Sequence, residues 1–106
     1  MTPEEALYIS IGQKLKGAEQ SQMFGKPCFK VGGKAFMSFF DNEMVFKLTG
    51  DAHADALSHD ASKQFDPSKK GRLMKEWVQV PADYKSKWAE YAKAAMQYVE
   101  SQNKKS

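Results

Sequence analysis

The feature that most constrains the fold is a pair of two-residue turns between three short runs rich in aromatic residues. Gly32-Gly33 follows the run that begins at Cys28, and Asp41-Asn42 follows the run KAFMSFF. A Gly-Gly pair suits a two-residue hairpin because both central positions of such a turn can need positive φ. Parallel neighbours need a crossover connection of about a dozen residues or more, so runs joined by two-residue turns can pair only antiparallel. The sequence predicts a three-stranded meander over roughly 28–31, 34–40 and 43–48.

Helical patterns flank this meander. Thr2-Pro3-Glu4-Glu5 combines a capping hydroxyl, a proline in the first turn and a glutamate placed for a capping box. Apolar residues then recur every four positions, which predicts an amphipathic helix that ends between Gly17 and Gln20. Further along, the patterns predict a short helix DAHADALSHD capped by Asp51, a strand over roughly 74–80 stopped by Pro81, and a final helix capped by Asp83.

These elements predict one α+β domain over residues 1–106. With 106 residues and 42% apolar content, the chain has room for a single core. We expect two layers: an antiparallel four-stranded sheet, with the N- and C-terminal helices packed on one face and a short helix before the last strand. The segment KQFDPSKKGR is predicted to be an exposed turn, and residues from about 100 onward a frayed tail.

Both faces of the predicted meander carry apolar groups. Strict alternation from the Gly-Gly turn puts Phe29, Val31, Lys34, Phe36 and Phe40 on one face, and Cys28, Lys30, Ala35, Met37 and Phe39 on the other. The second face is either covered or meets another subunit, and a bulge near Ser38 would reassign both sets. One hypothesis is therefore a homodimer with Cys28, Met37 and Phe39 in the interface.

The motifs that suggest catalysis or cofactor binding are incomplete. A phosphate loop would need glycine where Cys28 stands and a hydroxyl where Ala35 stands, so the hairpin interpretation is better. Cys28 as a nucleophile would need a lowered thiol pKa, for which Lys26 and Lys30 are the sequence neighbours able to help; the alternative is a packing residue. We nominate no catalytic residue and expect no cofactor.

The two histidines invite a metal hypothesis. Asp55 and His59 are four residues apart and would share a helix face, whereas His53 and His59 are six apart and would not. Two ligands make a weak site, and ordinary surface histidines on a solvated helix explain the pattern better. We nominate no metal ligand.

Lysines form the most suggestive pattern. Of the 16 basic residues, Arg72 is the one arginine, which argues against sequence-specific base reading but allows salt-sensitive attraction to polyanions. Two clusters surround the first hairpin and the loop into the fourth strand; if they lie at one end of the sheet, they form a basic surface suited to phosphate backbones. The candidate nucleic-acid-binding residues are Lys26, Lys30, Lys34, Lys69, Lys70, Arg72 and Lys75. Scattered, solubilising lysines are the alternative.

The segment MFGKPCFKVGGKAF, the strand EMVFKL, the segment FDPSKKGRLMKEWVQVP and a Trp-containing last helix resemble the TfoX N-terminal domain and the related MmcQ/YjbR-like small proteins. The resemblance covers nearly the whole chain and implies an α+β fold with an antiparallel sheet flanked by helices. It implies a link with competence-gene regulation for TfoX-like proteins and with DNA binding for YjbR-like ones. It implies no catalytic residue set. We expect a single TfoX N-terminal-like domain over 1–106, without the second domain of full-length TfoX.

Two functions stay open at this stage. The first is a small non-enzymatic protein with a regulatory role and weak, salt-sensitive nucleic-acid binding; the second is an assembly module that dimerises through an apolar sheet face. An enzyme or small-ligand protein would need a pocket that sequence does not reveal. A lone cysteine and the lack of a long apolar segment predict a cytoplasmic protein that does not enter a membrane.

Overall fold

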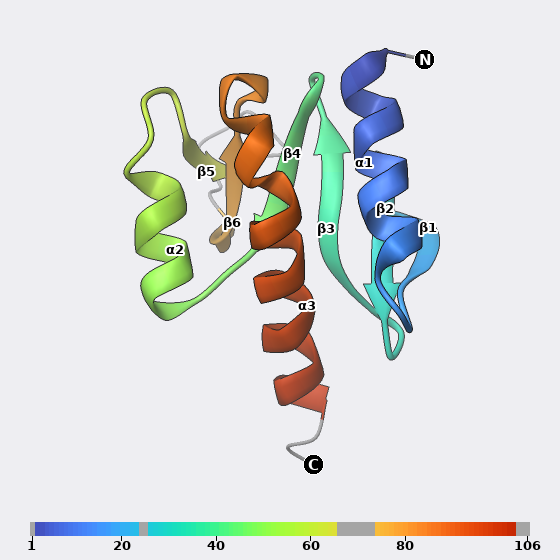
Figure 1. Cartoon of the computed structure of the whole chain (residues 1–106). Coiled ribbons are helices and arrows are strands. Elements are labelled where there is room, and N and C mark those ends of the chain that lie inside the picture. The colour runs from blue at the N-terminus through green and yellow to red at the C-terminus, as the bar shows by residue number, and fades with distance from the viewer. Residues whose placement is uncertain (1, 24–25, 66–73, 104–106) are drawn as a thin grey trace.

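The computed structural model describes residues 2–23, 26–65 and 74–103 of the chain. In chain order the helices are α1 (Pro3–Lys14), α2 (Gly50–Leu57), the 3-10 helix η1 (Ala82–Lys87) and α3 (Trp88–Asn103). The strands are β1 (Glu19–Met23), β2 (Lys26–Val31), β3 (Lys34–Phe40), β4 (Glu43–Lys47), β5 (Lys63–Phe65) and β6 (Met74–Val80). Figure 1 shows α1 and α3 in front of the sheet and α2 beside β5 and β6.

The α+β class is confirmed, but the sheet has six antiparallel strands and the prediction of four was wrong. Their order is β1-β2-β3-β4-β6-β5, so the two strands that were not predicted are the two edges. β1 has the polar sequence EQSQM, and β5 consists of the three residues KQF. An edge strand has one neighbour and needs no apolar alternation, which explains why a pattern search misses both. The segment predicted as an exposed turn therefore begins with a strand, and Phe65 is buried.

Both predicted turns and the Thr2 cap are present, but the caps predicted at Asp51 and Asp83 were wrong. The N-caps of α2 and η1 are Thr49 and Pro81, so Asp51 and Asp83 lie within the first turns of these helices. Gly32 and Gly33 have φ of 60° and 83°, and Asp41 and Asn42 have φ of 55° and 62°. Positive φ at both central positions is the geometry of a type I′ hairpin turn, whose twist matches that of the flanking strands. The first helix ends at Lys14, earlier than predicted, and the last helix is preceded by η1 rather than starting beside Asp83.

A β-bulge in β3 changes which side chains face the helices. Phe29 pairs with Met37, whereas the next residue of β2, Lys30, pairs with Ala35. Phe36 is thus the extra residue in β3, and both Phe36 and Met37 belong to the core beneath the helices. Strict alternation is correct before the bulge and wrong after it.

The bulge places three residues of β3 on the face opposite to the one that strict alternation predicts. Met37 and Phe39 lie in the helix-covered core, and Phe40 lies in a separate cluster with Val45, Phe65, Trp77 and Ala35. No described helical residue belongs to that second cluster. We call the side of the sheet that carries it the helix-free face. The opposite side is the helix-covered face.

The helix-covered face holds the main core. α1 contributes Tyr8 and Ile11, and α3 contributes a series that starts at Trp88 and includes Tyr91 and Val99. The Tyr8 ring lies between Phe29 and Phe39, with both centroid distances 5.3 Å. Burial of large aromatic groups supplies most of the stabilisation of such a layer. The terminal helices therefore pack on one sheet face, as predicted.

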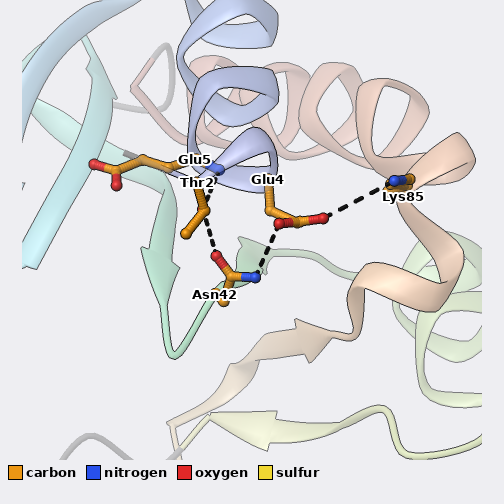
Figure 2. Close-up of polar contacts among 5 residues, drawn as sticks. All are labelled: Thr2, Glu4, Glu5, Asn42 and Lys85. Carbon is orange, nitrogen blue, oxygen red and sulfur yellow. Dashed lines mark hydrogen bonds and ion pairs between the residues drawn. The ribbon is translucent and has the colours of Figure 1, made fainter.

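Polar contacts attach α1 to the β3–β4 turn and to η1, as Figure 2 shows. Thr2 caps α1 by accepting a hydrogen bond from the Glu5 N–H, and its hydroxyl donates to Asn42 Oδ1 at 2.5 Å. The Asn42 amide donates to Glu4, whose other carboxylate oxygen is 3.9 Å from Lys85 Nζ. The hydrogen bond from Asn42 is the main reason why the pKa of Glu4 lies below its ordinary value. This network fixes the start of α1 over the margin of the sheet.

Across the described residues, no helix combines the length and apolar character needed to span a bilayer.

Candidate polyanion-binding face

The helix-free face combines a small apolar centre with basic side chains. Its centre consists of the buried residues Val45, Phe65 and Trp77, with half-buried Phe40 beside them. Phe40 and Phe65 meet edge to face with centroids 5.4 Å apart. Because the rings are largely enclosed, they hold the face together rather than offer open stacking platforms.

Strand register places three lysines on this face. Lys30 pairs with Ala35 and Lys47 with Trp77. Lys63 pairs with Gln79, which itself pairs with Val45. Paired residues of antiparallel strands point to the same side of the sheet. These three lysines therefore surround the apolar centre.

Lys26 is a fourth lysine on the same face. Its Nζ lies 4.7 Å from the centroid of the Phe40 ring, an arrangement that attracts a cation to the ring face. Two glutamates share the face by register, Glu19 on β1 and Glu43 on β4, and Glu43 accepts a hydrogen bond of 2.7 Å from Gln79. Among the described residues, these four lysines outnumber the two glutamates, so this part of the face has a positive balance.

The structure brings together only part of the predicted basic set. Lys26 and Lys30 share the helix-free face, whereas Lys34 pairs with Val31 of the helix-covered core and lies exposed at the hairpin turn. Lys75 belongs to β6. The remaining predicted residues, Lys69, Lys70 and Arg72, lie outside the described residues.

The residues predicted for a dimer interface are enclosed within the chain. Cys28 and Met37 have no exposed surface, and Phe39 is 9% exposed. They also do not share a face: Met37 and Phe39 lie under the helices, while Cys28 pairs with Ser38 on the opposite side. The bulge at Phe36 is the physical reason.

The Cys28 thiol is not activated. Burial raises its pKa, and the nearby positive charge of Lys30 lowers it less than burial raises it. A buried thiol with a raised pKa stays protonated at neutral pH and makes a poor nucleophile. Cys28 is therefore a packing residue in the described structure.

A hydrogen-bond chain joins α2 to α3. The Tyr91 hydroxyl donates to Asp55 Oδ2 at 2.5 Å, and His59 Nε2 lies 2.6 Å from the same hydroxyl. Because the single proton of the hydroxyl goes to Asp55, His59 must donate its Nε2–H. The His59 ring also stacks on Tyr84, with centroids 4.4 Å apart. These contacts hold α2 against the η1–α3 segment.

The same chain borders a shallow groove of about 380 Å³ between α2 and α3. Burial raises the pKa of Tyr91, and its hydrogen bond lowers the pKa of Asp55. At neutral pH the phenol therefore holds its proton and the carboxylate stays charged, so the pair is not tuned for proton transfer near pH 7. Among the described residues no three His, Cys, Asp or Glu side chains gather as a metal site.

The model of the TfoX N-terminal domain family matches residues 11–100. The chain belongs to this family. The match covers all six strands of the sheet and most of α3. No curated protein and no solved structure matches the chain.

Sequence reasoning missed several notable residues of this TfoX N-terminal domain. Lys47 and Lys63 were not nominated, although alternation from Val45 would have placed Lys47 beside the apolar centre. Lys63 belongs to the lysine cluster around the loop into the fourth strand, but β5 reads as part of a polar loop, so the sequence did not place Lys63 on a sheet face. The helical spacing of Tyr91 indicates a packing role, yet its hydroxyl also joins Asp55 and His59. The hydrogen bonds of the Tyr91 hydroxyl depend on how α2 packs against α3, so they are seen only in the folded structure.

Proposed function

We propose that this TfoX N-terminal domain is a non-enzymatic protein that binds nucleic acid through phosphate contacts on its helix-free face. One observation carries the proposal: Lys26, Lys30, Lys47 and Lys63, from three different strands, lie on the same side of the sheet. Lysines that converge on one surface attract a phosphate backbone by charge, without reading base edges.

The chemistry of this face favours binding that is independent of sequence. Lysine acts as a mobile point charge, whereas guanine recognition favours the planar fork of arginine. Trp77 is buried and Phe40 is partly covered by Lys26, so neither ring is free to stack on an unpaired base. We therefore expect duplex and single-stranded oligonucleotides to bind with similar, modest affinity.

The protonation states of the groups beside the α2–α3 groove support the non-enzymatic part of the proposal. Tyr91 and Asp55 have pKa values displaced away from neutrality in opposite directions. The Cys28 thiol is enclosed and protonated at neutral pH. None of these groups has the reactivity that acid–base or nucleophilic catalysis at pH 7 requires.

Fluorescence anisotropy with labelled duplex and single-stranded oligonucleotides, measured over a range of salt concentrations, tests the binding. The informative variant combines Lys30→Gln with Lys47→Gln. Removal of one phosphate contact should reduce the slope of log affinity against log salt by about 0.9 on duplex DNA, and removal of two by about 1.8. Lys26 is left in place because its contact with Phe40 also supports the fold.

The matched control combines Lys14→Gln with Lys93→Gln. These lysines are exposed on α1 and α3, away from the helix-free face, and their replacement changes the net charge by the same amount. The control should keep the slope of the unmodified protein. No binding at low salt, or equal losses of affinity in the two double variants, would refute the proposal.

A further inference from the structure

The two edges of the sheet differ in how well they are protected against pairing with another strand. β5 is three residues long and carries Lys63, and its pairing is interrupted by a bulge in β6, since Gln64 pairs with Val78 but Phe65 with Met74. Short length, a bulge and lysine are three common means by which proteins block edge-to-edge association. The β5 edge is thus closed to a further strand.

β1 lacks those protections. It pairs with β2 over five consecutive positions, from Glu19 opposite Lys30 to Met23 opposite Lys26, without a register shift. It contains no lysine, proline or bulge, and β2 is its one neighbouring strand in the described chain. Gln20 and Gln22, which point to the helix-covered face, are exposed, so α1 does not bury this strand. The backbone N–H and C=O groups that point away from β2 form a regular template for another strand.

We propose that β1 is a dimerisation edge that pairs antiparallel with β1 of a second copy of this chain. Pairing centred on Ser21 places Gln20 opposite the second copy's equivalent of Gln22, and the reverse. Side-chain amides can donate and accept at once, so two such pairs are complementary. Glu19 would face the equivalent of Met23, so no like charges oppose each other along the strand.

Charge also favours a second copy as the partner. In each chain Lys26 pairs with Met23 and therefore lies one strand beyond it. In the dimer Glu19 of one copy and Lys26 of the other would flank the same Met23 position on the same face. These opposite charges lie two strand spacings, about 9.6 Å, apart, which is within the roughly 10 Å over which exposed charges still attract each other at 0.1 M salt.

The arrangement closes on itself. The two-fold axis passes midway between the two Ser21 residues, so both β1 edges are paired in the dimer. The outer edges of the combined sheet are then the two protected β5 strands. The sheet would continue through both copies with the two helix-free faces on the same side. The β2 strands of the two copies would lie about 14 Å apart, three strand spacings, so that Lys26 and Lys30 of both copies gather near the axis.

Sedimentation equilibrium of the full chain, from micromolar to millimolar concentration, tests the proposal. The expected result is a rise from the 12.0 kDa mass of one chain toward twice that value. The double variant Gln20→Lys with Gln22→Lys should weaken dimerisation roughly tenfold, because two like-charged pairs would face each other across the axis. The control, Gln13→Lys with Gln97→Lys, adds the same charge on exposed positions of α1 and α3 and should leave dimerisation unchanged.

Amide hydrogen exchange locates the interface. Protection of the outward-facing amides of β1 should increase with protein concentration, while amides of β5 should not change. A mass of one chain up to millimolar concentration would overturn the proposal, as would a dimer that the Gln20 and Gln22 substitutions leave intact. Neither result would affect the nucleic-acid proposal, which the lysine variants on β2 and β4 test separately.

Discussion

The two faces of the sheet differ in how they exclude water from the same strands. In β4, Met44 and Phe46 point to the helix-covered face, where helices enclose them, whereas Val45 between them points to the helix-free face. Val45 is just as fully buried, but the described residues around it are strand side chains, among them Phe65 and Trp77. A helix layer encloses a large core, while a face without helices can enclose only a small one and keeps basic groups at its surface.

Replacing one phenylalanine on each face tests this difference most strongly. Phe46→Ala should lower the free energy of unfolding by about 3–5 kcal/mol, since it leaves a cavity beneath α3 next to Tyr91. Phe40→Ala should cost less, because Phe40 is only half-buried. Urea denaturation followed by circular dichroism measures both values. Equal losses would mean that the two faces contribute alike to stability.

Gly12→Ala tests how closely α1 approaches the helix-covered face. A Cβ at this position would overlap the Phe29 ring. Alanine favours a helix interior over glycine by up to about 1 kcal/mol, but overpacking a filled core costs about 1–3 kcal/mol. We expect net destabilisation in thermal denaturation. Gly50→Ala is not a suitable control, because Gly50 has a positive φ that alanine disfavours. Ser10→Ala is the control: it changes a half-buried position of α1 and should alter the melting temperature little. A stabilised Gly12→Ala protein would mean that α1 can move away from the sheet.

Thr2→Ala tests the polar attachment of the helix layer. The substitution removes both the cap on Glu5 N–H and the hydrogen bond to Asn42, and should cost about 1 kcal/mol. Thr2→Ser keeps the hydroxyl and should restore most of that loss in the same urea titration. Equal losses in the two variants would assign the effect to the threonine methyl group instead.

Asp55→Asn should have the smallest effect, and one that depends on pH. The hydrogen bond from Tyr91 lowers the pKa of Asp55 below its ordinary value of 3.8 in the folded protein. A carboxyl group with a lowered folded pKa stabilises the fold above its unfolded pKa, and this contribution disappears as pH falls through the folded pKa. The substituted amide would keep an acceptor for Tyr91 without the charge.

Unfolding free energies at neutral pH and in acid measure this effect. The variant should be less stable than the unmodified protein at neutral pH, and the difference should vanish in acid below the folded pKa. Asp51→Asn, on the same helix and beside the same groove, removes a charge without the Tyr91 bond and serves as control. A difference that stays constant with pH would show that the charge of Asp55 is not responsible.

Residues whose local conformation decides their structure were predictable from the sequence. Gly32-Gly33 and Asp41-Asn42 form the expected turns, and Thr2 caps the first helix as expected. β1 and β5 were not predictable from pattern, because an edge strand made of Glu, Gln and Ser has no apolar period. The dimer hypothesis through Met37 and Phe39 rested on alternation alone, which the bulge interrupts.

The candidate site was predictable only in outline. An excess of lysine over arginine indicated phosphate attraction without base reading. Which lysines share a face depends on strand register, and the register across β4, β6 and β5 connects segments far apart in the chain. Alternation places Lys47 on the side of Val45, but that Lys63 shares this face required the structure. The pairing of Tyr91 with Asp55 and His59 depends on how α2 packs against α3, which helical spacing does not determine.

The bulge at Phe36 also limits how the length of this chain can vary. The part of β3 before it takes its orientation from the Gly32-Gly33 turn, and the part after it from the core and the β3–β4 turn. Deleting a residue after the bulge, such as Ser38, would exchange inward and outward side chains on one side of the deletion, whereas deleting Phe36 itself would only make the ladder regular. The number of residues in this strand is thus constrained as strictly as their chemical type.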